Sequence, residues 1–330
     1  MSVTIQDVAL LAGVSVTTVS RVMNNRGSLS EKTRLKVHDA MRQLNYHPNQ
    51  IARNLLQQRT GIVGIIVPDV SHNYYGRIVK CIEEELCLKG YKLMLCNSKN
   101  EQNLEKDYIE MLQCHRADGI ILASHTQEQD AYCGLTAPIV TLDIPLGTHV
   151  PIIASDHSCG GRLAADELLR CGCRKVAQVW GISSTAKPTD LRHRTFEEVI
   201  NAHGAVCKTV QIPVNVFDFS RYLQITEELL NTMPDIDGFF AADNIAIAMI
   251  RSAYNRGIKI PDQLKIVGYD GIDTSYLVTP ALTTIQQNIP EIAKTAVEAL
   301  ARVIEEETVK PLKPISVQLI RRQTTQHILT

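Results

Sequence analysis

Small polar and cationic side chains gather near the amino terminus, in a spacing that suits contact with nucleic acid. Outside its apolar positions, the segment 16–24 offers side chains of this kind only: Thr17, Thr18, Ser20, Arg21 and Asn24. An arginine guanidinium can donate two hydrogen bonds to a guanine edge, and small hydroxyl and amide groups can bond to phosphates. The chemistry predicted for this segment is therefore recognition in a major groove.

A helix-turn-helix would position these side chains. Residues 4–24 have the pattern of two short helices joined by a tight Ala12-Gly13-Val14 turn. Thr4 and Ser15 both suit the N-cap position, and Gly13 can adopt a left-handed backbone conformation. Apolar residues recur at helical spacing and predict a miniature core made of Val8, Leu11, Val14, Val19 and Val22.

Charge sets this head apart from the rest of the chain. Residues 1–60 contain eight Lys/Arg and three Asp/Glu, a net charge of +5; the whole chain carries −1, so the remainder carries −6. A cationic head can release the counterions of nucleic-acid phosphates, whereas an acidic body cannot. A basic three-helix module that binds a protein is the alternative interpretation of the head.

Length and composition bound the remaining possibilities. A chain of 330 residues is too long for one ordinary core and predicts two or three domains. No apolar run reaches the roughly 20 residues of a membrane span, and the first residues lack the pattern of a signal peptide. The nine cysteines are scattered and lack paired zinc spacing, which predicts reduced thiols in a cytoplasmic protein.

The segment that follows the head predicts a hinge. Pro48 ends the preceding helix, and Asn49 can cap a new helix of barely two turns, which is too short to be stable alone. We therefore expect it to become ordered only on binding. Leu55 and Leu56 have no evident core to join, so they either pack against the twin linker of a dimer or enter a minor groove as a wedge.

From Gly61 onward, strands and helices alternate in two successive series. The expected strands are 62–68, 92–96, 119–123, 139–142, 175–179, 209–212, 238–241, 265–268 and 315–320, and the expected helices are 75–88, 104–114, 159–171, 191–203, 221–232, 245–256 and 289–306. Two such series predict two doubly wound parallel-sheet lobes. The cleft between the lobes is the expected ligand site.

Motifs of common enzymes do not occur in the sequence. The chain has no G-x-x-x-x-G-K-[ST] phosphate loop, no G-x-G-x-x-G after its first strand and no H-E-x-x-H metal pair. A glycosidase would need two carboxylates across a sugar; Asp143 and Asp270 are carboxylates, but nothing in the sequence marks either as a proton donor. We expect no catalytic residues, no metal ligands and no cofactor.

Longer motifs cover essentially the whole chain. The head contains Val8-Ala9-x-x-Ala12-Gly13-Val14-Ser15-x-x-Thr18-Val19-Ser20-Arg21-Val22, and the hinge contains Tyr46-x-Pro48-Asn49-x-x-Ala52-Arg53-x-Leu55. The body contains Val67-Pro68-Asp69, Ala117-Asp118-Gly119, Ser155-Asp156, Val267-Gly268-Tyr269-Asp270 and Leu282-Thr283-Thr284. These motifs resemble the lactose/galactose repressor (LacI/GalR) family of bacterial transcriptional regulators. The stretch Thr189-Asp190-Leu191-Arg192-His193 looks most like the sucrose-operon repressors of Gram-positive bacteria.

The resemblance implies an all-α helix-turn-helix head with a hinge helix, followed by an α/β body of two doubly wound parallel-sheet lobes like those of periplasmic binding proteins. The DNA-binding domain would span 1–47, the hinge helix and linker 48–60, and the effector-binding and dimerisation body 61–330. Within the body, lobe one would comprise about 61–154 and 288–312, and lobe two about 155–287 and 313–330.

Residue by residue, the resemblance places Val16, Thr17 and Arg21 against base edges and Leu55 in the minor groove. Ser15, Thr18, Asn24, Ser28, Thr33 and Asn49 would hold phosphates, and Thr4 and Ala52 complete the DNA-binding set. In the cleft, an effector would lie among Tyr74, Tyr75, Asp143, Arg192, Phe219, Asp270 and Gln287. Arginine and aspartate side chains can bind adjacent sugar hydroxyls. A core role for Phe219 and a turn-capping role for Asp143 are the alternatives.

The function implied is repression of a sugar-utilisation operon. The protein would bind palindromic operator DNA as a homodimer, without a membrane partner, and respond to a small carbohydrate that is sucrose-related or another sugar. A cationic cluster is either solvated surface or favours binding of a phosphorylated sugar; it consists of Lys187, Arg192, His193 and Arg194. No heptad repeat follows Ile320, which favours a dimer over a tetramer. The sequence leaves open whether the sugar acts as an inducer or as a corepressor. The alternative function is a cytoplasmic sugar-binding sensor without operator-specific repression.

Overall fold

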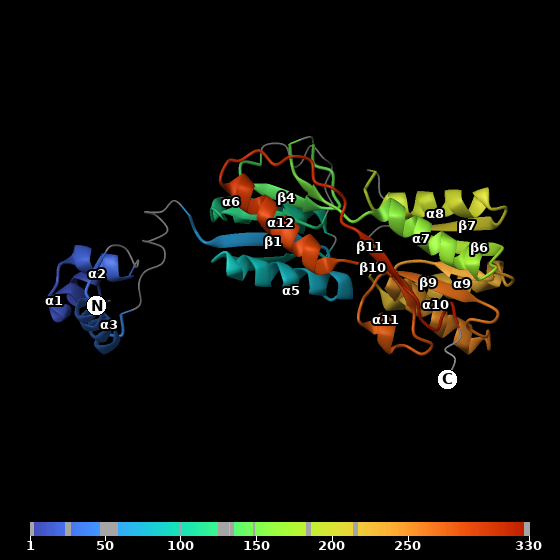
Figure 1. The fold of residues 1–330 in the computed structure, drawn as a ribbon, viewed down its shortest axis with the longest axis horizontal. Helices are drawn as coiled ribbons and strands as arrows, with labels where there is room; N and C mark the ends of the chain where they lie inside the picture. Colours follow the sequence, from blue (N-terminus) through green and yellow to red (C-terminus); the bar gives the residue numbers. More distant parts are fainter. Residues whose placement is uncertain are drawn as a thin grey trace. The chain divides into compact units, whose positions relative to one another are not determined.

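The computed structural model describes residues 3–23, 28–46, 59–99, 101–124, 132, 135–147, 149–182, 186–213 and 217–326. The chain divides into two compact units, Met1–Thr60 and Gly61–Thr330 (Figure 1). Most of the predicted hinge lies outside the described residues, and so do Asn24, Asn49, Ala52, Leu55 and Leu56.

The first unit forms the helix-turn-helix expected from its capping residues. It contains α1 (Ile5–Ala12), α2 (Val16–Met23) and α3 (Glu31–Gln43). Thr4 and Asp7 form a reciprocal capping box, in which the Thr4 backbone N–H donates to the Asp7 carboxylate at 2.8 Å. Gly13 ends α1 at φ 66°, a left-handed conformation that costs glycine little, so the chain can turn directly into α2.

The core of this unit is made of small residues: Val8, Ala9, Ala12, Val19, Val22, Val37 and Ala40. Val14 packs against this core while partly buried. The prediction that Leu11 belongs to the core is wrong, because its side chain is 49% exposed. The buried stripe of α1 instead follows Val8, Ala9 and Ala12, which pack in one cluster with residues of α2 and α3.

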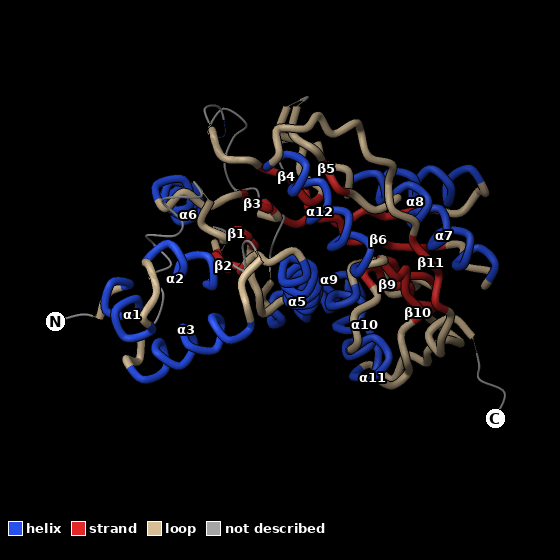
Figure 2. Tube along the Cα trace, turned by 60° about the vertical axis from the view of Figure 1, so that its left-hand side comes forward, coloured by secondary structure: helices blue, strands red, loops and turns tan. Residues whose placement is uncertain are grey.

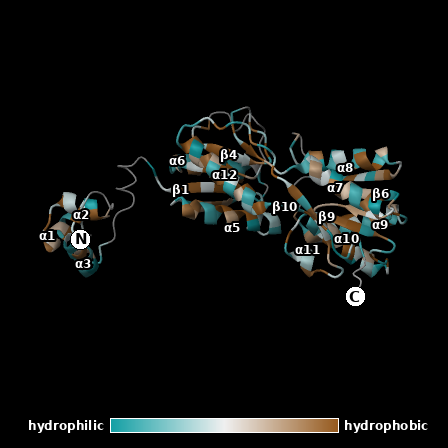
Figure 3. Cartoon of the chain, in the orientation of Figure 1, coloured by the Kyte–Doolittle hydropathy of each residue, from teal (hydrophilic) through white to brown (hydrophobic). Residues whose placement is uncertain are grey.

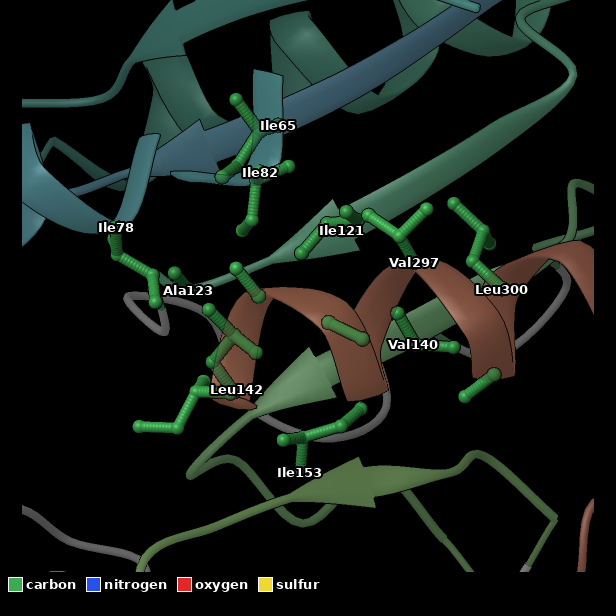
Figure 4. Packing of buried hydrophobic residues seen from close by; sticks show 14 of the residues in the cluster. Ile65, Ile78, Ile82, Ile121, Ala123, Val140, Leu142, Ile153, Val297 and Leu300 are labelled. Carbon is green, nitrogen blue, oxygen red and sulfur yellow. The ribbon is translucent and has the colours of Figure 1, made fainter. Parts of the chain in front are cut away.

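The first sheet of the body is parallel and has the strand order β2-β1-β3-β4-β5. Its strands are β1 (Ile62–Val67), β2 (Lys92–Asn97), β3 (Gly119–Leu122), β4 (Ile139–Leu142) and β5 (Ile152–Ile153). Helices α5 (Asn73–Leu88) and α12 (Ile289–Ile304) cover one face, where Ile65, Ile121 and Val140 meet Val297 and Leu300 (Figure 4). Helix α6 (Gln102–Cys114) covers the other face through Leu112.

The second sheet has the strand order β11-β10-β9-β8-β6-β7. Its strands are β6 (Lys175–Ile182), β7 (Val206–Pro213), β8 (Gly238–Phe240), β9 (Lys265–Asp270), β10 (Thr283–Gln287) and β11 (Val317–Ile320). They are parallel except β11, which runs antiparallel to β10. One core joins the sheet to α9 (Phe219–Thr232) and α10 (Asp243–Asn255), and another joins it to α7 (His157–Arg170) and α8 (Asp190–Ala202). Strands therefore lie between helices in both sheets (Figure 2).

The chain passes to the second sheet after β5, returns to the first with α12, and leaves it again to form β11. Hydrophobic residues fill the central strands β1, β3 and β4 of the first sheet, whereas the helices alternate between hydrophobic and hydrophilic residues (Figure 3). The predicted alternation of strands and helices is confirmed, with boundaries shifted by a few residues. The prediction omits β5, β10 and the short helix α11 (Thr274–Leu277).

Candidate nucleic-acid interface and ligand cavity

Helix α2 carries the predicted base-contacting side chains on its exposed side. Val19 and Val22 are buried in the core, whereas Val16 is 41% exposed, and Thr17 and Arg21 are exposed as well. Residues four apart lie on the same side of a helix, so Thr17 and Arg21 are neighbours there. A nucleic acid can therefore reach these side chains without any change in the core.

Of the predicted phosphate-binding residues, Ser15, Thr18 and Thr33 also form hydrogen bonds at the starts of helices. The Thr18 backbone N–H donates to Ser15 Oγ at 3.1 Å, and the two hydroxyl oxygens lie 2.9 Å apart. The Thr33 backbone N–H donates to Ser30 Oγ at 3.2 Å. Thr4, Ser15 and Ser28 are exposed, and Thr18 and Thr33 are half-buried. Helix starts of this kind attract phosphate, because their N–H groups and dipoles face outward.

The body contains a cavity at the carboxyl ends of the strands of both sheets. Its empty volume, counted out to the open mouth, is about 1110 Å³. The cavity brings together most of the predicted effector residues, namely Tyr74, Tyr75, Asp143, Arg192, Asp270 and Gln287. Two facing lobes thus supply side chains to one site, as the topology predicts.

Phe219 is not among the residues that line this cavity. Asp218 caps helix α9 by accepting a hydrogen bond from the Ser220 backbone N–H at 2.8 Å, which makes Phe219 the first helical residue. The Phe219 side chain is 59% exposed, and its ring lies 5.9 Å from that of Tyr222. Phe217, which precedes the cap, lines the cavity instead.

A histidine joins the two lobes beside the cavity. His157, at the start of α7, is buried; its Nε2 lies 2.9 Å from Asp143 Oδ1 and its Nδ1 lies 2.8 Å from the Tyr269 hydroxyl. Asp143 follows β4 of the first sheet, and Tyr269 belongs to β9 of the second. Asp143 has a φ of 56°, a conformation that costs a non-glycine residue energy and is concentrated at functional sites. His157 therefore connects the two lobes through its contact with the Asp143 carboxylate.

Arg192 is held over the ring of Tyr269 and near a carboxylate. Its guanidinium carbon lies 4.3 Å from the Tyr269 ring centroid, and its Nη1 lies 4.0 Å from Asp270 Oδ1. The Gln287 amide donates to the same Asp270 oxygen at 2.8 Å. Burial raises the pKa of Asp270, and the nearby Arg192 charge opposes that rise.

His193 supports Arg192 as a neutral ring. Burial, together with the charge of Arg192, lowers the pKa of His193 well below its ordinary value. The Arg192 Nε–H donates to His193 Nε2 at 3.1 Å, so the ring proton is on Nδ1 and points to Gln178 Oε1 at 2.9 Å. Arg194, the fourth member of the cationic segment, is exposed and lies 6.0 Å above the Trp180 ring.

Sequence reasoning missed several residues that line the cavity: His72, Trp180, Phe217 and Tyr222. The rings of His72 and Phe217, from opposite lobes, have centroids 4.9 Å apart. They share no single position in the fold: His72 is the N-cap residue of α5, Trp180 lies within β6, Phe217 precedes the cap of α9, and Tyr222 lies within α9. Aromatic faces together with carboxylates and a guanidinium can bind a polyhydroxylated ring, because its C–H and O–H groups need different partners.

Among the described residues, no group of three or more His, Cys, Asp or Glu side chains is arranged to hold a metal ion. Within the same part of the chain, no single helix is long and apolar enough to cross a membrane; α1 and α2 pass that test only when taken together, with a bend of 103° between them.

Comparison with known proteins identifies both parts of the chain. Residues 4–49 match the family described as bacterial regulatory proteins, lacI family, and residues 165–325 match the periplasmic binding protein-like domain. The chain is 40% identical over 300 residues to a sucrose operon repressor of Streptococcus mutans, covering 91% of this chain and 92% of that protein. It is 34% identical over 328 residues to a ribose operon repressor of Halalkalibacterium halodurans, covering 98% and 97%.

Solved structures have a similar fold. The chain is similar to the lac repressor dimer bound to operator and an anti-inducer, with a TM-score of 0.88 and 26% identity over 99% of this chain and 100% of that chain. A helix-turn-helix unit joined to a two-lobed receptor defines a class of ligand-responsive transcriptional regulators. The chain belongs to the LacI family within that class. Its relatives are repressors, which confirms the prediction that it is not an enzyme.

Proposed function

We propose that this protein represses a sugar-utilisation operon: it binds a palindromic operator as a homodimer, and a small carbohydrate in the interlobe cavity controls that binding. The observation that carries the proposal is the cavity, where Asp143, Arg192 and Asp270 meet aromatic rings. The names of its relatives support it, since they are repressors of sucrose and ribose operons. Two similar structures are complexes with cellobiose and with D-xylulofuranose, at 25% and 32% identity.

In the head, Val16, Thr17 and Arg21 read base edges, and Thr4, Ser15, Thr18, Ser28 and Thr33 hold the phosphate backbone. The family resemblance predicts four more residues in this interface: Asn24, Asn49, Ala52 and Leu55. Two heads related by a two-fold axis require two half-sites of opposite direction, which is why the operator is palindromic. We place the protein in the cytoplasm because operator DNA lies there.

In the body, the predicted division into lobes of about 61–154 with 288–312, and 155–287 with 313–330, gives each lobe one sheet. Tyr74, Tyr75, Asp143, Arg192, Asp270 and Gln287 bind the sugar, with Phe217 in the role predicted for Phe219. A sugar hydroxyl that bonds to Asp143 competes with His157 for the same carboxylate and thereby alters how the lobes meet. By linkage, sugar then changes operator affinity by the same factor as operator changes sugar affinity.

Selection of duplexes from a random pool, followed by electrophoretic mobility shift with and without sugars, tests the proposal. We expect a symmetric duplex to be enriched and its affinity to change when the right sugar is added. Absence of any preference for symmetric duplexes over random DNA contradicts the repressor function. Sugar binding without such a preference supports the alternative, a sugar sensor that does not bind an operator.

A further inference from the structure

Lys187 is a cation of the cavity that the protein leaves unpaired. The residue lines the cavity three positions before α8. Its backbone N–H donates to Asp190 Oδ2 at 2.9 Å. Within the ranges that the structure describes, its ammonium group makes no hydrogen bond or ion pair. Arg192, the other permanent cation of the cavity, already has Tyr269 and Asp270 as partners.

The acids around Lys187 are engaged elsewhere. Asp143 bonds to His157 at 2.9 Å, and Asp270 accepts from the Gln287 amide at 2.8 Å. Asp190 accepts from the Trp180 indole N–H at 3.1 Å as well as from the backbone of Lys187. Glu105 accepts from the Ser124 hydroxyl at 2.6 Å. None of these carboxylates lies within ion-pair distance of the ammonium, so one positive charge of the cavity is uncompensated by contact.

This charge also lies where water is partly excluded. Burial lowers the pKa of Lys187, and the charges of Asp190, Glu105 and Asp143 oppose that change. A partly desolvated ammonium gains most from a partner that carries a full negative charge, because a hydroxyl group offers only a dipole. A neutral sugar would therefore leave Lys187 poorly satisfied.

The surroundings of Lys187 favour an anion as well. Thr189, the residue before α8, also lines the cavity, and its side chain makes no capping bond to the helix. The first turn of an α-helix carries a partial positive charge from its free N–H groups, and Asp190 offsets part of it. Lys187, Thr189 and the beginning of α8 thus form one corner of the cavity, with Arg192 one turn further along.

We infer that the effector is an anionic saccharide whose phosphate or carboxylate group binds Lys187 at this corner, while Arg192 and Asp270 bind ring hydroxyls. The inference rests on the proposed function, because it concerns the ligand of the same cavity. Lys187 then determines whether a charged sugar is preferred over its neutral parent. Thr189 and the beginning of α8 strengthen that preference, but the charge of Lys187 is required for it.

Isothermal titration calorimetry with the full chain tests whether the cavity prefers an anionic sugar. The probes are glucose, fructose and sucrose, the 6-phosphate of each, and glucuronate as the carboxylate counterpart. We expect at least one anionic sugar to bind about tenfold or more tightly than its neutral parent. Lys187→Gln should remove this preference and leave the affinity for the neutral parent nearly unchanged, whereas Lys187→Arg should retain it. Arg194→Gln, a nearby charge outside the cavity lining, is the matched control.

The inference is overturned if neutral sugars bind as tightly as the anionic ones, or if Lys187→Gln weakens both equally. A preference for 6-phosphates over glucuronate identifies phosphate as the group at Lys187, and the reverse identifies carboxylate. Mobility shifts on the same preparations separate the two hypotheses: operator release by a neutral sugar alone refutes the anionic effector and leaves the repressor function intact. Failure to prefer any symmetric duplex refutes the repressor function instead.

Discussion

Replacing Gly161 with alanine tests whether the close crossing of α7 and α8 positions Arg192. A Cβ at position 161 would lie 2.1 Å from the Arg192 carbonyl oxygen and 2.9 Å from its Cα. An ordinary carbon–oxygen contact is about 3.3 Å, so α8 must retreat by about 1 Å. The obstacle is backbone, which cannot swing aside as the end of a side chain can.

The expected change in stability follows from two opposing terms. Overpacking against backbone lies at the upper end of its usual range, about 3 kcal/mol. Alanine in place of helical glycine gains about 1 kcal/mol. We therefore expect the free energy of unfolding to fall by about 2 kcal/mol, seen as a lower urea midpoint by circular dichroism. Because the retreat carries Arg192 away from Tyr269 and Asp270, effector affinity should fall about tenfold or more.

Arg162→Ala provides the control, because Arg162 is the next residue of the same helix and is exposed. It should leave the urea midpoint and the effector affinity near their original values. If Gly161→Ala is as stable as the original protein and binds effector with the same Kd, the helix crossing does not hold Arg192, and the reasoning is refuted.

Three further predictions concern DNA contact, effector response and acid stability. Arg21→Ala should cost about 1–3 kcal/mol of operator binding and relax base choice at one position in each half-site; an unchanged footprint would contradict the assignment. Arg192→Ala should abolish the response to effector in mobility shifts while operator binding persists, and a variant that still responds would show that the cavity is not the effector site. Burial raises the pKa of Glu167, but hydrogen bonds from Arg170, Arg321 and Thr325 together outweigh burial and lower the pKa to about 2. The stability that these contacts contribute is present above pH 4.5 and is lost as the pH falls toward 2. Glu167→Gln should therefore flatten the dependence of the urea midpoint on pH across that range. Equal acid sensitivity of the variant and the original protein would contradict this role of Glu167.

Local signals were sufficient where local interactions decide the structure. Thr4, Ser15 and Gly13 predict the helix-turn-helix because caps and a left-handed turn act within a few residues. The same holds for β1, because its run of β-branched apolar residues is typical of a buried strand. Strand β10 escapes prediction because its polar residues are buried by partners far along the chain: Thr284 donates to Asp243 Oδ1 at 2.6 Å.

The cavity was predictable in place but not in all its residues. Strand order places the site at the strand ends, yet the choice between Phe217 and Phe219 depends on Asp218 acting as a cap. The partner of Asp143 depends on how two lobes approach each other, so His157 carries no sequence signal for that role. Lys187 is prominent in the sequence, but only the packing around it distinguishes it from the exposed Arg194.

Helix α12 has a consequence for how the protein is made. The ribosome must translate past Leu300 before the first sheet can be closed on the face that holds Ile65 and Val140. Until then α5 alone packs on that face, and the part that α12 covers remains open to chaperones and proteases. A message cut short upstream of Ile289 therefore encodes a complete helix-turn-helix attached to a body that cannot bury its core. Such fragments should be degraded before they can compete with intact molecules for DNA.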